Sequence, residues 1–112
     1  FAAMRQAMPM NMRRAPKPIA VSEAVAADVA RIAKSWADAR KAHGKGGPFL
    51  FGKFGAVDAM YAPVVARFVG YAVELPKAAR DYRDAVADLP AYRAWAADAA
   101  AEPWRIERFE AP

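Results

Sequence analysis

The sequence predicts an all-α fold, a bundle of about five helices. Alanine makes up about a quarter of the 112 residues, and alanine loses no side-chain entropy on entering a helix. Apolar residues recur at helical spacing in five segments, whereas no segment alternates apolar and polar residues as a half-buried strand does. A chain of this length buries a single core, so we expect residues 1–112 to form one domain.

The first helix is expected to be short and to end before Pro9. Phe1, Met4 and Met8 lie at helical spacing, which indicates the last part of a helix. A non-helical turn is predicted over residues 8–14, and a proline-containing extended linker follows it. Met4 and Met8 are therefore candidates for the core or for a contact with another domain.

The second helix is predicted from Ser22, a favourable N-cap, to about His43. Its apolar residues are spaced by four, three and four positions, which places one stripe on one face: Val25, Val29, Ile32 and Trp36. Glycines end the helix directly after His43. His43 is the only histidine, and we expect it at the surface, where an imidazolium would complement the negative helix end.

A third helix is expected from about Ala56, and apolar side chains cover more than half of its circumference, which predicts a central, buried helix. Pro76 and Pro90 are expected at the first positions of the fourth and fifth helices, where a missing amide costs nothing. The residues that predict the inward faces of these three helices are Val57, Met60, Tyr61, Val64, Val65 and Phe68; Ala79, Tyr82, Val86 and Leu89; and Tyr92, Trp95, Ala96 and Ala99.

The composition argues against several functions. The net charge is +5, but the basic N-terminal residues are not interleaved with stacking groups, so nucleic-acid binding is not predicted. No apolar run reaches the roughly 18 residues that a membrane-spanning helix needs. The chain has no cysteine, which removes disulfides, thiolate metal ligands and cysteine nucleophiles, and which fits a reducing cytoplasm.

No arrangement of residues predicts a catalytic or metal site. Asp58 has no histidine and no second acid at a catalytic spacing, and His43 alone cannot hold a metal. Near the third position of its helix, Asp58 can accept a hydrogen bond from an amide at the helix start. We therefore expect Asp58 to stabilise the fold, and its replacement by alanine to cost about 1 kcal/mol.

Residues 47–65 carry the most specific pattern in the sequence. They are G-P-F-L-F-G-K-F-G-A-V-D-A-M-Y-A-P-V-V, a glycine-punctuated aromatic turn that leads into an amphipathic helix. This stretch resembles the C-terminal helical domain of glutathione S-transferases, in which G-x-F-L-x-G-x-x-S/T-x-A-D leads into the buried central helix. Further segments are similar to bacterial members: P-M-N-M-R from residue 9, L-P-A-Y-R-A-W from residue 89 and E-P-W from residue 102.

The resemblance implies a pocket for a hydrophobic electrophile beside the P-M-N-M-R segment. The candidate substrate-binding residues are Met8, Met10, Asn11, Arg13 and Tyr61. Flexible thioethers suit a pocket that accepts varied apolar molecules, but the same methionines could serve only in packing. Tyr61 likewise has two interpretations, a hydrogen-bond donor in a site or a core aromatic.

The resemblance also implies structural roles, namely helix capping and contact with another domain. In the family the aspartate that matches Asp58 forms a capping box with a serine or threonine, and here Gly55 occupies that position, so half of the box is missing. Phe1 and Trp104 are the candidates for contact with another domain.

The function that the resemblance implies for the complete protein is conjugation of glutathione to a hydrophobic electrophile. Glutathione would be the co-substrate, bound mainly by a thioredoxin-like N-terminal domain that is absent from this chain and that carries the thiol-activating group. The chain is then a fragment or part of a longer protein, with no catalytic residue of its own, and a homodimer is expected. The alternative is a non-catalytic scaffold module that binds proteins, since this helical domain recurs in such roles and fold alone does not decide function.

Overall fold

The computed structural model describes residues 1–110 and is helical, as predicted. It contains α1 (Ala2–Ala7), α2 (Glu23–His43), α3 (Ala56–Gly70), α4 (Lys77–Ala87), α5 (Pro90–Ala101) and α6 (Glu107–Glu110). The described residues contain no strand, and Phe49 and Gly52 form only an isolated bridge. The all-α prediction is confirmed, and the helix that it lacked is α6, a single turn in the tail.

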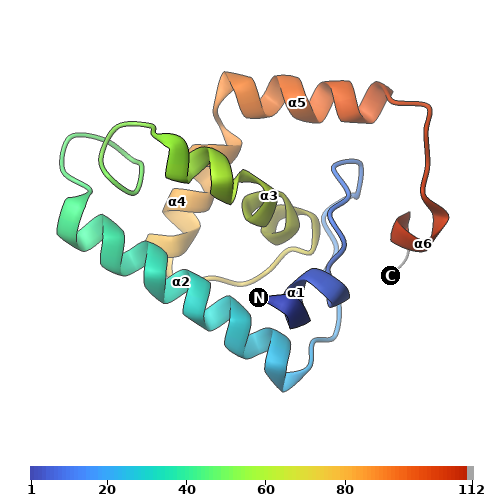
Figure 1. Cartoon of the computed structure of the whole chain (residues 1–112), viewed down its shortest axis with the longest axis horizontal. Helices are drawn as coiled ribbons and strands as arrows, with labels where there is room; N and C mark the ends of the chain where they lie inside the picture. Colours follow the sequence, from blue (N-terminus) through green and yellow to red (C-terminus); the bar gives the residue numbers. More distant parts are fainter. Residues whose placement is uncertain (111–112) are drawn as a thin grey trace.

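The helices form a flattened bundle of 42 × 34 × 19 Å. Figure 1 shows α3 near the middle, with α2 along one side and α5 along the opposite edge. The segment after α1 rises past α3 toward the end of α5, and the tail with α6 descends beside it. Residues from the two ends of the chain therefore meet on one side of the bundle.

The helices begin at the residues that the sequence marks. The Ser22 hydroxyl accepts a hydrogen bond from the Val25 amide at 3.3 Å, and Pro90 is at the start of α5. Pro76 differs slightly from the prediction because it is the N-cap of α4 and not its first helical residue. Its extended backbone (ψ 154°) directs its carbonyl to the amide of Arg80, at 2.9 Å.

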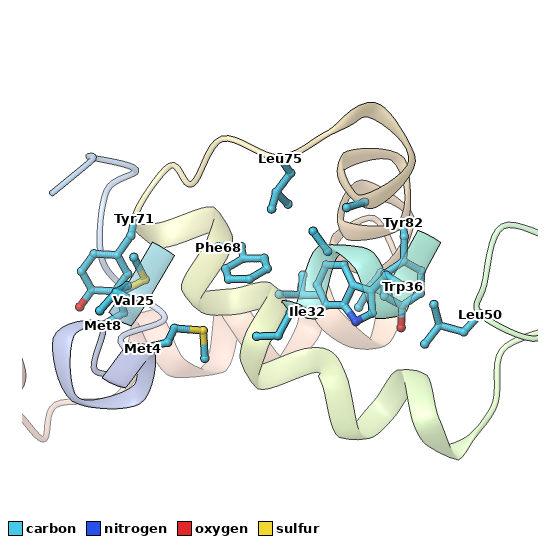
Figure 2. Close-up of a cluster of buried hydrophobic side chains, with 14 residues drawn as sticks. Met4, Met8, Val25, Ile32, Trp36, Leu50, Phe68, Tyr71, Leu75 and Tyr82 are labelled. Atoms are coloured by element: carbon cyan, nitrogen blue, oxygen red, sulfur yellow. The ribbon is translucent and has the colours of Figure 1, made fainter. Parts of the chain in front are cut away.

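An aromatic cluster forms one end of the core (Figure 2). Trp36 on α2 is fully buried and makes edge-on contacts with Tyr61, Phe68 and Tyr82, at centroid distances of 5.4, 5.5 and 4.8 Å. The other end of the core contains Met4 on α1 and Met8 at the C-cap of α1. Of their two interpretations, core residue or contact with another domain, the first is confirmed. The core thus joins α1, α2, α3 and α4.

The outer face of α3 and most of α5 are less covered than the apolar patterns predicted. Met60 on α3 is 80 % exposed, so its prediction as an inward residue of a central, buried helix is wrong, although Val65 and Phe68 of the same helix are buried. On α5 no residue is buried, and its predicted inward residues Tyr92 and Trp95 are half-buried. The physical reason is that α5 packs mainly on α4 and not on α3, so neither helix covers the other closely.

An arginine that the sequence did not single out organises the turn after α2. The guanidinium of Arg40 donates to the carbonyls of Gly44, Gly47 and Phe49, at 3.0, 2.6 and 2.7 Å. Gly52 has a φ of +86°, and a Cβ there would lie 2.4 Å from the carbonyl oxygen of Lys45. The positive φ angles of Gly46 and Gly52 favour glycine at these positions. The turn connects the end of α2 to the start of α3.

Candidate functional site

Asp58 is the fully buried charged residue among residues 1–110, and three donors surround it. Its Oδ2 accepts from the Gly55 amide at 2.8 Å, and its Oδ1 accepts from the Tyr82 hydroxyl at 2.8 Å and the Leu50 amide at 3.3 Å. The side chain thus connects the turn before α3, the start of α3 and the inner face of α4. The sequence suggested the first of these bonds and gave no sign of the other two.

The environment of Asp58 suits a structural acceptor better than a proton donor or nucleophile. Burial, and then the hydrogen bond to Asp58, raise the pKa of Tyr82 far above its ordinary value. The tyrosine therefore keeps its proton, and the carboxylate is occupied by donors from the protein itself. Asp58 is fully buried at the base of the groove between α3 and α5, so its carboxylate is not exposed to solvent there.

The raised pKa of Tyr82 predicts a loss of stability at alkaline pH. An unfolded tyrosine loses its proton near pH 10, whereas the folded Tyr82 holds it, so its contribution is complete below that pH and falls as the pH rises. The stability difference between the unmodified chain and Tyr82→Phe should shrink by about 1.4 kcal/mol between about pH 8 and pH 11. Urea unfolding at both pH values measures this, and a constant difference would contradict it.

Gly55 offers a second test of the helix start. It is the N-cap of α3 with an extended backbone (φ −141°), and a Cβ there would meet only Asp58 Oδ2, at 4.0 Å. Because glycine has no side chain, only the Asp58 half of a capping box is present. We predict that Gly55→Ser raises the free energy of unfolding by about 0.3 kcal/mol.

The matched control for Gly55→Ser is Gly52→Ser in the same turn. At Gly52 the positive φ and the close Lys45 carbonyl leave no room for a side chain. This variant should lose more than about 1 kcal/mol of stability. Thermal unfolding of both variants separates them, and a Gly55→Ser protein that melts below the unmodified chain would show that the capping interpretation of Gly55 is wrong.

The P-M-N-M-R segment is the second candidate site. Its side chains bind the tail, residues 102–110, through hydrogen bonds and an ion pair. Asn11 Oδ1 accepts from the Arg13 amide at 3.0 Å, which closes a small turn. The Arg13 guanidinium then donates to the carbonyls of Glu102 and Trp104, at 2.8 and 2.9 Å, and lies 3.3 Å from a carboxylate oxygen of Glu110. Asn11 Nδ2 donates to the other Glu110 oxygen at 3.1 Å. Two segments about 90 residues apart are thereby tied together.

A cavity of about 400 Å³ lies between this segment, α5 and the tail; we call it the tail cavity. Its wall is mostly apolar with a few polar groups. The lining residues include Met10, Asn11, Arg13, Trp95, Trp104 and Phe109. Three of the five predicted substrate-binding residues, together with Trp104, therefore line one cavity. The sequence predicted Trp95 only as an inward residue of its helix, and it could not place Phe109 there, since the tail has no clear helical period.

The other predicted site residues lie elsewhere. Met8 is buried in the core and touches a separate apolar groove beside α2, and Tyr61 packs edge-on against Trp36 without lining the tail cavity. Phe1 is partly exposed beneath the Arg31 guanidinium, and Trp104 is 78 % exposed. His43 is exposed in the last turn of α2, with its ring 5.3 Å from that of Phe51.

Two further properties concern the described residues 1–110 only. They contain no group of three or more histidine, aspartate or glutamate side chains that could hold a metal ion. None of their helices is both long enough and apolar enough to cross a membrane.

The fold defines the class of protein: an all-α domain whose central helix follows a glycine-rich aromatic turn and begins at a buried aspartate. A family model described as "Glutathione S-transferase, C-terminal domain" matches residues 20–98, more than half of the chain. The chain therefore belongs to this family. Comparisons with curated proteins and with solved structures give no match. The matched range includes Asp58 and Tyr61, whereas the P-M-N-M-R segment and Trp104 lie outside it.

Proposed function

We propose that this chain is the electrophile-binding domain of a glutathione S-transferase that conjugates glutathione to hydrophobic electrophiles. The observation that carries the proposal is the tail cavity, where Met10, Asn11 and Arg13 lie with Trp95 and Trp104. Family membership supports glutathione as the co-substrate. The remaining parts of the proposal are a thioredoxin-like partner domain, a homodimer and a place in the cytoplasm.

The proposed reaction divides the work between two domains. The glutathione thiolate attacks an electrophilic carbon, a carbon–sulfur bond forms, the leaving group departs with its electron pair, and the thiol proton passes to solvent. The thioredoxin-like domain would bind glutathione and lower the pKa of its thiol. The present chain would hold the electrophile against the apolar wall of the tail cavity and keep water away from it.

The test measures steady-state conjugation of chlorodinitrobenzene by the complete protein. We expect Met10→Ala to raise the KM for this electrophile about threefold, because it removes part of the apolar wall, and to leave the KM for glutathione unchanged. Phe51→Ala removes an exposed apolar side chain outside the cavity and is the matched control. Absence of any conjugation, or an equal effect of both variants, would refute the proposal.

A second candidate function, the scaffold module, is favoured by the open side of α3. Phe54 is 51 % exposed and lines a groove of about 340 Å³ together with Leu89 and Trp95. Met60, elsewhere on α3, is 80 % exposed. Exposed apolar surface of this kind fits a protein partner. The same assay separates the two functions, since a scaffold binds its partner and does not conjugate glutathione.

A further inference from the structure

A second cavity adjoins the tail cavity and differs from it in charge; we call it the basic cavity. It has a volume of about 590 Å³ and lies between α1, α3 and the tail. Met10, Ile106 and Phe109 line both cavities. The residues that distinguish the basic cavity are Arg5 on α1 and Arg67 on α3. The two cavities therefore share an apolar boundary, and one of them carries two positive charges.

The two arginines have no acidic partner. Among residues 1–110 neither forms an ion pair, and no acidic residue lines the basic cavity. Burial, and then the nearby charge of Arg5, lower the pKa of Arg67. Two like charges that face one cavity without compensation create a positive potential there, and the apolar wall keeps water from screening it fully.

Arg67 is also held in a fixed orientation. Its Nε donates to the Met8 carbonyl at 2.9 Å, and its Nη1 donates to the Pro63 carbonyl at 3.1 Å. The described residues provide no acceptor for its Nη2. Because the guanidinium is planar and two of its nitrogens are bound, the position of Nη2 is fixed in advance, so an anion loses little entropy in meeting it.

We propose that the basic cavity binds the acidic group of an apolar ligand, between Arg5 and Arg67. The apolar body of the ligand would lie against Met10, Ile106 and Phe109, where the two cavities meet. This inference rests on the proposed function and narrows it, because it makes the substrates apolar electrophiles that carry a carboxylate or sulfonate.

The test compares two dyes that differ by one acidic group. Anilinonaphthalene sulfonate carries it, and phenylnaphthylamine has the same apolar skeleton without it. Fluorescence titration of the complete protein, in the absence of glutathione, gives the affinity of each. Arg5→Gln is the main variant, because the exposed Arg5 side chain makes no hydrogen bond or ion pair with residues 1–110 and the substitution keeps its backbone bond to the Phe1 carbonyl, so we expect the fold to stay intact. Arg80→Gln on α4 removes the same charge away from the basic cavity and is the control.

We expect Arg5→Gln to weaken binding of the sulfonate dye about fivefold and to change binding of the neutral dye less than about twofold, while Arg80→Gln changes neither. Equal loss for both dyes, or no loss for the sulfonate dye, would overturn the inference. An unchanged affinity for the sulfonate dye would mean that Arg5 does not contact the acidic group, as would be the case if a carboxylate of another domain paired with Arg5 and Arg67. Because the titration needs no glutathione, its failure is distinct from a failure of chlorodinitrobenzene conjugation, which tests the proposed function.

Discussion

Asp58→Ala is expected to lower the free energy of unfolding by about 3 kcal/mol. The sequence alone predicts about 1 kcal/mol, the cost of a lost helix cap. The structure raises this value because the side chain accepts from three donors, and the Leu50 amide and the Tyr82 hydroxyl are buried with it. Removal of the carboxylate leaves these buried donors without partners. Urea unfolding monitored by circular dichroism gives the free energy directly.

Asp38→Ala is the matched control for Asp58→Ala. Asp38 is an exposed aspartate on α2 that pairs with Lys34 on the same helix face, and its loss should cost less than about 0.5 kcal/mol. If Asp58→Ala were as stable as this control, the hydrogen bonds around Asp58 would have no structural role. A complete protein that keeps its stability but loses conjugation would instead place Asp58 in the reaction.

The helices could be predicted from the sequence because their signals are local. Each helix end lies within a few residues of its apolar pattern. Ser22 and Gly44 mark the two ends of α2, and Pro90 marks the start of α5. The degree of burial could not be predicted in the same way. Met60 has the spacing of an inward residue but is exposed. Such exposure depends on which helices pack together, and a local pattern does not contain that information.

In the candidate sites, too, local sequence patterns identified single residues but not the contacts between distant segments. The P-M-N-M-R segment and Trp104 were marked by resemblance, yet only the fold shows that Arg13 ties the two ends of the chain together. Tyr82 was predicted as an inner residue of α4, but its bond to Asp58 crosses 24 positions. Arg5 and Arg67 gave no signal, since each is a single arginine on a different helix. Contacts over such separations follow from tertiary packing.

Trp36→Ala is expected to have the largest effect on stability, a loss of about 4 kcal/mol. Trp36 is fully buried, and its ring contacts aromatic side chains from α3 and α4, so its truncation leaves a cavity where three helices meet. Total stabilities of single domains are about 5–15 kcal/mol, so this loss removes much of the total. Urea unfolding should show a midpoint far below that of the unmodified chain.

Trp36→Phe separates the contribution of packing from that of the indole nitrogen. Trp36 Nε1 is buried, and residues 1–110 provide no hydrogen-bond partner for it. Phenylalanine removes this unpaired donor and keeps part of the ring, so we expect a loss of only about 1–2 kcal/mol. Trp104→Ala, at an exposed tryptophan, should change stability by less than about 0.5 kcal/mol. Equal losses for Trp36→Ala and Trp36→Phe would contradict this account, because the six-membered ring that phenylalanine keeps would then add nothing to the stability of the core.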